Sequence, residues 1–127
     1  MPRLDVMADS AYDLYTRGTR LLQDGDFHAA TVSLERARDL EPDKTSVREA
    51  LGRALFHAQR YEQAAEEFEA VVDRAPTNDF ALFCLGRSLM LLGRHREATH
   101  PLALASNLRP ERGDYAKYRD QARRRAA

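Results

Sequence analysis

The sequence predicts an all-α fold, a solenoid of three antiparallel helix pairs followed by a C-terminal capping helix. A pattern of small, apolar and helix-breaking residues recurs every 34 residues along the chain. Three of its positions are a glycine, an alanine and a closing proline: Gly18, Ala30 and Pro42, then Gly52, Ala64 and Pro76, then Gly86, Ala98 and Pro110. A fixed period of this length, with two helical segments in each copy, indicates stacked helical repeats.

The composition fits a single globular domain. The 127 residues are 43% hydrophobic and 31% charged, enough to bury a core. Acidic and basic residues balance at 20 each, so nothing favours a nucleic-acid or membrane partner. Cys84 is the only cysteine, and no apolar run resembles a signal peptide or the roughly 20-residue span of a membrane helix. We therefore expect a cytoplasmic protein, and the scarcity of lysine favours a bacterial source.

The expected elements follow in order. Residues 1–10 form a short tail, and Ser10 with Asp13 can cap the first helix. Repeats are expected at 11–44, 45–78 and 79–112, with the capping helix at 113–127. The two helices of each repeat are separated by breaks at Gly25-Asp26, near Gln59-Arg60 and at Gly93-Arg94. The second helix ends near the closing proline, which donates no amide and clashes with a preceding carbonyl.

Small residues explain how the paired helices pack. A glycine inside a helix costs about 1 kcal/mol relative to alanine. We expect close approach to the alanine of the partner helix to offset that cost, as for Gly52 and Ala64. Pro101 falls inside the last repeat helix, and we expect it to kink that helix or to delay its start.

Both ends of the array have a distinct pattern. The second and third copies turn apolar or small residues toward the preceding repeat, whereas the first copy has Asp13, Arg17 and Arg20 at those positions. We therefore expect the first copy to be an N-terminal cap with no repeat ahead of it. After the last repeat, Tyr115, Tyr118 and Ala122 form an apolar stripe, which predicts a helix covering the end of the third repeat.

With these residues in view, the chain resembles three tandem tetratricopeptide repeats over about residues 11–112. The second copy matches best, with its Leu51-Gly52 pair, Ala64, Phe68 and Pro76. Departures are the absence of tryptophan, Arg48 where a large apolar residue is usual, and His95 in place of an aromatic. The resemblance implies a right-handed superhelix whose first helices line a concave groove for a segment of a partner protein.

Carrying that surface over residue by residue gives a candidate groove rich in aromatic residues and arginine, the types enriched in binding hot spots. Its candidates are Tyr12, Tyr15, Thr19, Leu22 and Gln23; Ser46, Glu49, Arg53, Phe56 and His57; and Phe80, Phe83, Arg87, Met90 and Leu91. We expect an apolar segment whose acidic group faces Arg53 and Arg87. The alternatives are that the aromatic rings only pack between helices, and that Arg53 pairs with Glu49.

One known ligand of the family is not expected. Members that bind the C-terminal tail of large chaperones use lysine, asparagine and arginine to hold its carboxylate. The corresponding positions here carry no suitable side chain: Tyr15, Thr19, Ala50, Phe80 and Cys84.

Nothing in the sequence indicates catalysis, a cofactor or a metal. The four histidines show no pair spaced to share a metal from one helix face: His28, His57, His95 and His100. Cys84 is expected to be a small buried hydrophobe. Two charged runs are interpreted as solvated surface: Glu62, Glu66, Glu67 and Glu69, and Arg123 to Arg125. We find no phosphate-binding loop or nucleophile motif, so we do not expect an enzyme.

The sequence therefore favours an adaptor that binds a peptide-like segment of another protein in the concave groove. Two alternatives remain open at this point. One is a homodimeric scaffold element that buries the same apolar groove against a second copy. The other is a small assembly chaperone for a specific client.

Overall fold

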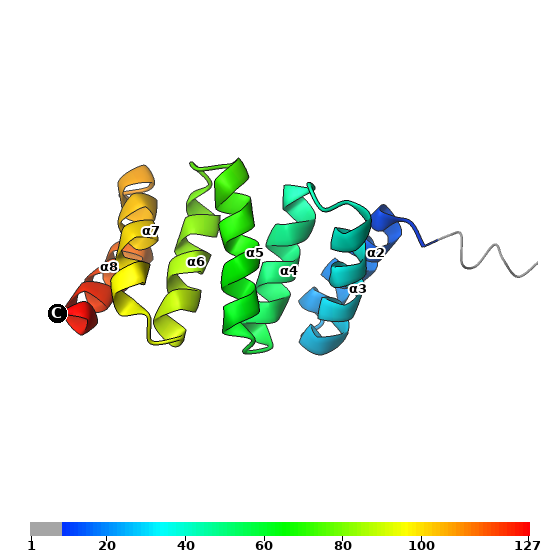
Figure 1. Ribbon diagram of the computed structural model, residues 1–127, viewed down its shortest axis with the longest axis horizontal. Coiled ribbons are helices and arrows are strands. Elements are labelled where there is room, and N and C mark those ends of the chain that lie inside the picture. The colour runs from blue at the N-terminus through cyan, green and yellow to red at the C-terminus, as the bar shows by residue number, and fades with distance from the viewer. Residues whose placement is uncertain (1–8) are drawn as a thin grey trace, which may run out of the picture.

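The computed structural model describes residues 9–127, which form seven α-helices and no strand (Figure 1). Residues 1–8 of the expected tail lie outside the described range. The helices are α2 (Ala11–Gln23), α3 (Phe27–Leu40), α4 (Thr45–His57), α5 (Tyr61–Arg74), α6 (Asp79–Leu91), α7 (His95–Leu108) and α8 (Gly113–Ala126). Each helix packs mainly on its neighbours in the chain, so the helices follow one another along the long axis. The predicted solenoid of three helix pairs with a capping helix is confirmed.

The helix boundaries have local causes that the sequence anticipated in part. At the start of α2, the Ser10 hydroxyl accepts a hydrogen bond from the Asp13 amide at 3.1 Å, and Asp13 accepts one from the Ser10 amide at 3.2 Å. This is the predicted cap. The turns inside the pairs share one backbone feature, a left-handed residue at the same repeat position: Gly25 (φ 82°), Gln59 (φ 64°) and Gly93 (φ 79°).

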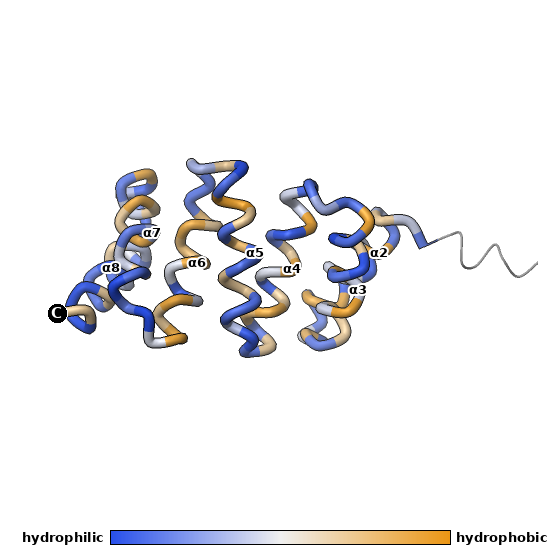
Figure 2. Tube along the Cα trace, in the orientation of Figure 1, coloured by the Kyte–Doolittle hydropathy of each residue, from blue (hydrophilic) through white to orange (hydrophobic). Residues whose placement is uncertain are grey.

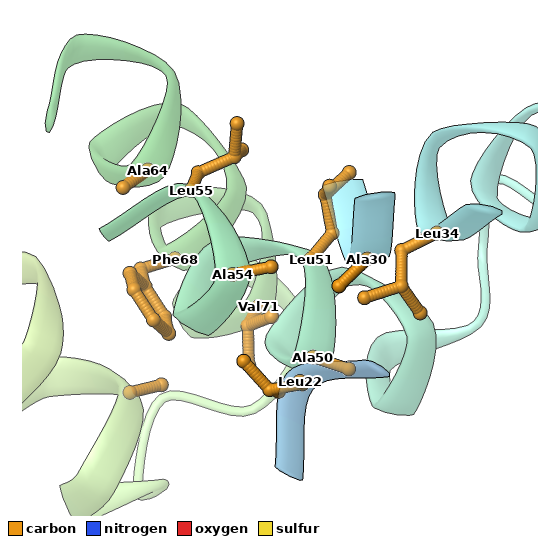
Figure 3. Close-up of a cluster of buried hydrophobic side chains, with 11 residues drawn as sticks. Leu22, Ala30, Leu34, Ala50, Leu51, Ala54, Leu55, Ala64, Phe68 and Val71 are labelled. Carbon is orange, nitrogen blue, oxygen red and sulfur yellow. The ribbon is translucent and has the colours of Figure 1, made fainter. Parts of the chain in front are cut away.

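The helical glycines face large side chains of the partner helix. A Cβ atom placed on Gly18 or Gly86 would lie 2.5 or 2.4 Å from the Cγ atom of Leu34 or Leu102, closer than atoms can approach. Gly52 faces the ring of Phe68 in the same way. The core therefore needs glycine at these three positions. Figure 3 shows Leu34 and Phe68 within one buried cluster, and Figure 2 shows polar and apolar residues alternating along the helices.

Pro101 does not delay the start of its helix, contrary to one of the two expected effects. Helix α7 begins at His95, the same repeat position as Phe27 and Tyr61, and runs without a break to Leu108. The Pro101 ring itself is buried. A proline one turn or more inside a helix leaves the N-terminal bonds in place and removes only its own amide.

The expectation that all four acidic residues of α5 face solvent is wrong for one of them. Glu62, Glu66 and Glu69 are exposed, but Glu67 is only 5% exposed. Its carboxylate bridges two guanidinium groups, that of Arg38 on α3 at 2.6 Å and that of Arg48 on α4 at 2.9 Å. A buried carboxylate needs such partners because desolvation is costly. The interaction also explains why Arg48 replaces the usual apolar residue.

Helix α8 covers the third helix pair through the predicted stripe. Tyr115 and Ala122 are fully buried, and Tyr118 is half-buried. The Tyr115 hydroxyl donates a hydrogen bond to the Asp79 carboxylate at 2.7 Å, and its ring stacks on that of Phe83 with centroids 4.6 Å apart. The capping helix is therefore attached to α6 as well as to α7.

Candidate functional site

A pocket of about 120 Å³ lies between α4 and α6, with α5 at its base. We call it the α4–α6 pocket. It is lined by Arg53, Phe56, His57, Phe68, Phe80, Phe83, Cys84 and Arg87. All but Phe68 and Cys84 are candidates from the sequence, and Arg53 and Arg87 occupy equivalent positions 34 residues apart.

The aromatic side chains of this pocket are held by ring contacts. Phe56 meets His57 and Tyr61 edge-on, with centroids 5.8 and 5.4 Å apart. The His57 ring also stacks on that of Phe27 with centroids 4.7 Å apart, so His57 contacts the first helix pair. Phe80 is 38% exposed and is the most exposed of the phenylalanines that line this pocket.

The two arginines are held differently. The Arg87 guanidinium lies 4.0 Å from the ring centroid of Tyr118 and 5.9 Å from that of Phe56, distances suited to cation–π contact. Its buried Nε atom has no hydrogen-bond partner. Arg53 is exposed and forms no ion pair within residues 9–127. No ion pair joins Arg53 to Glu49, whose carboxylate accepts a hydrogen bond from Asn78 at 3.2 Å.

Cys84 has the environment of a packing residue. Burial, with a smaller effect from Glu49, raises the pKa of its thiol to about 12. The thiolate is the nucleophilic form of cysteine, and it is scarce at neutral pH when the pKa is this high. The thiol contributes a small, polarizable wall to the pocket and has no reactive character there.

The first helix pair contributes a second pocket, of about 250 Å³, between α2 and α4. Three candidates line it together with four further residues: Tyr12, Tyr15 and Ser46, with Ala11, Glu41, Lys44 and Val47. Tyr12 is 74% exposed. The candidate groove thus consists of two separate hollows, one at each helix junction.

The remaining candidates lie elsewhere. Leu22 and Met90 are buried in the core, so neither side chain is open to a partner. Thr19 is half-buried and donates its hydroxyl to the Thr16 carbonyl at 3.0 Å. Gln23 and Leu91 are exposed at the ends of their helices. Tyr118, which orients Arg87, was predicted only as part of the capping stripe.

Within the part of the chain that the structure describes, no group of three or more histidine, cysteine, aspartate or glutamate side chains could hold a metal ion. No helix among residues 9–127 is long and apolar enough to cross a membrane.

A solenoid of helix pairs with an aromatic hollow on its first helices defines a protein-interaction scaffold of the helical-repeat class. A family profile described as tetratricopeptide repeat matches residues 15–79, half of the sequence. The chain belongs to the tetratricopeptide repeat family. A search of curated protein sequences found no match.

Solved structures agree on the fold. A structure of MamA (AMB-1) superposes with a TM-score of 0.82 at 27% identity, covering 89% of this chain. The first tetratricopeptide domain of Spaghetti (RPAP3), bound to the HSP90 peptide SRMEEVD, gives 0.83 at 16% identity, covering 91% of each chain. YrrB, described as having an unusual peptide-binding site, gives 0.81 at 22% identity, covering 87% of this chain and 57% of its own. This chain spans 62% and 65% of two MamA structures (AMB-1 and MSR-1).

Proposed function

We propose that the chain is a non-enzymatic adaptor that binds a peptide-like segment of a partner protein in its concave groove, centred on the α4–α6 pocket. The observation that carries the proposal is the gathering of Phe56, Phe80 and Phe83 with both groove arginines around one hollow. Aromatic side chains and arginine supply large contact area and directional bonds, which dominate binding energy at interfaces.

The pocket's chemistry selects the kind of segment. An apolar side chain of the partner fits against Phe80 and Phe56, and an acidic group or carboxylate meets Arg53. That guanidinium forms no ion pair within the described residues, so binding an anion breaks no existing interaction. Arg87 adds positive charge from the other wall while its stack on Tyr118 holds it in place.

Two structural neighbours support peptide binding as a use of this fold. The RPAP3 domain is bound to an HSP90 peptide, and YrrB has an unusual peptide-binding site. We do not extend the chaperone tail to this chain, because the positions that would hold its carboxylate are Tyr15, Thr19, Ala50, Phe80 and Cys84. The partner is therefore proposed by chemistry alone, and a cytoplasmic location is part of the same proposal.

The test is to capture partners with the tagged protein, identify the bound segment by cross-linking, and measure its affinity for variants. Phe80→Ala and Arg53→Ala should each weaken binding about tenfold, since both side chains are exposed and neither holds the core. Leu40→Ala, exposed on α3, is the matched control and should bind normally. Equal affinity for all four proteins would reject the pocket as the binding site.

A further inference from the structure

A separate cleft of about 340 Å³ lies between α5, α6 and α7, and none of its lining residues belongs to the α4–α6 pocket. We call it the α5–α7 cleft. Figure 1 shows α6 between α5 and α7 in this part of the array. The apolar side chains at its base are Ala65, Val72, Leu82, Leu85, Leu89, Pro101 and Leu104. Of these, Val72, Leu85 and Leu104 retain exposed surface.

The preceding junction shows why this cleft is open. There, Arg38, Arg48 and Glu67 form the buried ion pairs that join α3, α4 and α5. Adding 34 to each number gives Val72, Leu82 and Pro101, all in the α5–α7 cleft. Three long charged side chains that bridge the first junction are thus replaced by shorter apolar ones, which leave an apolar base open to solvent.

The rim of the cleft carries negative charge along α5. Glu62, Glu66, Glu69 and Asp73 line it at spacings of three or four residues, which place them on one helix face. Only Glu62 is paired, with Arg94 at 3.3 Å, and Arg94 also binds Glu97 at 2.8 Å. The other three carboxylates have no ion-pair partner among the residues described.

We propose that the α5–α7 cleft is a second docking surface, for a basic amphipathic segment of a partner protein. An apolar side chain of that segment would cover Val72, Leu85 and Leu104. Its lysine or arginine residues would meet Glu66, Glu69 and Asp73. Complementary charge selects a basic segment over an acidic one and speeds association, while the apolar base supplies contact area. The α4–α6 pocket carries arginines, so the two surfaces select segments of opposite charge.

The experiment measures binding of a fluorescein-labelled synthetic amphipathic peptide of leucine and lysine by anisotropy. A peptide with glutamate in place of every lysine is the ligand control. The triple variant Glu66→Gln, Glu69→Gln, Asp73→Asn should weaken binding about tenfold, because three exposed charge pairs are lost. Glu35→Gln with Asp39→Asn removes carboxylates from the equivalent positions of α3 and should leave the affinity within about twofold.

A second variant tests the apolar base. Val72→Arg, Leu82→Arg and Pro101→Glu together transfer the ion-pair set of the first junction into the cleft and should abolish binding. Circular dichroism checks that this variant folds. If it does not fold, the triple variant and its α3 control test the proposal by themselves. Arg53→Ala should have no effect, which separates this proposal from the groove proposal.

Several results would overturn the inference. They are no saturable binding of the lysine peptide, equal binding of the glutamate peptide, an unchanged affinity of the triple variant, or an equal loss with the α3 control. Reversible self-association that the triple variant abolishes would make a second copy the occupant, and would equally reject a foreign segment.

Discussion

At the scale of single residues, the contact between a helical glycine and the next helix limits how the pairs can pack. Gly86→Ala should lower the free energy of unfolding by about 1–2 kcal/mol. Overpacking against Leu102 costs more than the roughly 1 kcal/mol that alanine gains in a helix. Gly113→Ala is the matched control, because no atom lies within 4 Å of its added Cβ, and it should be neutral or stabilising. Urea denaturation of both variants measures the difference, and equal stability would contradict the packing argument.

Gln59 is the one non-glycine residue with positive φ in the described chain. The equivalent positions of the other two repeats are glycine, which adopts this conformation without a steric penalty. Gln59→Gly should therefore raise the free energy of unfolding by about 0.5–1 kcal/mol, after the greater entropy of the unfolded chain is subtracted. Gln63→Gly, in the first turn of α5, should instead destabilise by about 1 kcal/mol, because glycine is a poor helix former and the hydrogen bond from Arg60 is lost. Thermal unfolding of the two variants tests whether the changes in stability have opposite signs. A loss of stability in both variants would refute the prediction for Gln59.

Glu67 shows what sequence reasoning at this scale missed. The helical spacing along α5 groups Glu67 with other acidic residues, and its partners come from two other helices. Arg48 was recognised as a departure from the repeat pattern, without a reason for it. Comparing equivalent positions could have supplied one: Arg38, Arg48 and Glu67 are charged where the next repeat has Val72, Leu82 and Pro101.

At the scale of helices, the attachment of α8 depends on an un-ionised tyrosine. Burial, together with the hydrogen bond to Asp79, raises the pKa of Tyr115 to about 12. In the unfolded chain the pKa is about 10. The contribution of Tyr115 to the stability of the fold is therefore complete below about pH 10. It is lost as the pH rises toward 12, because in that interval the phenol ionises in the unfolded chain and not in the folded one.

Tyr115→Phe should remove this dependence of the free energy of unfolding on pH. At pH 8 the variant should be less stable by about 1 kcal/mol, since it lacks the hydrogen bond to Asp79. Between pH 10 and 11.5 the difference from the parent protein should shrink. Chemical denaturation across this range provides the measurement, with Tyr12→Phe on the exposed α2 surface as control. Parallel stability curves for the parent and Tyr115→Phe would reject the assignment.

Helices were the most predictable part of the fold because their ends have local causes. Ser10, Gly25 and Gly93 act within a few residues of the boundaries that they set, so the sequence alone suffices. Pro101 was harder to predict, because its effect depends on how far it lies from the first turn of α7. The capping helix was predicted from an apolar stripe of three residues. The hydrogen bond from Tyr115 to Asp79 was not predicted, because no short-range pattern relates two positions so far apart in the sequence.

At the scale of the whole molecule, the repeat register identifies equivalent positions in the three helix pairs and not how deeply each side chain is buried. Phe56, Phe80 and Arg87 line one pocket, whereas Leu22 and Met90, at the positions of α2 and α6 equivalent to Phe56, are buried. Depth depends on the superhelical arrangement of neighbouring pairs and on which side chains fill each junction. A one-dimensional pattern does not contain that information.

Solution mass separates the adaptor proposal from the homodimer that the sequence left open. Large exposed apolar side chains are spread over α2, α3, α6 and α7: Tyr12, Val32, Leu40, Phe80, Leu91, Leu104 and Leu108. A stable dimer interface needs roughly 800 Å² from each partner in one continuous patch. Scattered side chains and a pocket of about 120 Å³ favour insertion of a narrow segment over face-to-face pairing. We therefore expect a mass of 14.4 kDa, that of one chain, by light scattering at every concentration.

Phe80→Glu is the variant that makes this measurement decisive. It places a charge at the mouth of the α4–α6 pocket, on a side chain that is 38% exposed, so the fold should tolerate it. If the parent protein is a dimer and this variant is a folded monomer, the groove serves self-association and the adaptor proposal fails. If both are monomers and only the variant loses its captured partner, the pocket is the binding site. Circular dichroism of the variant completes the comparison, since retained helicity ensures that a change in mass or binding reports on the pocket rather than on unfolding.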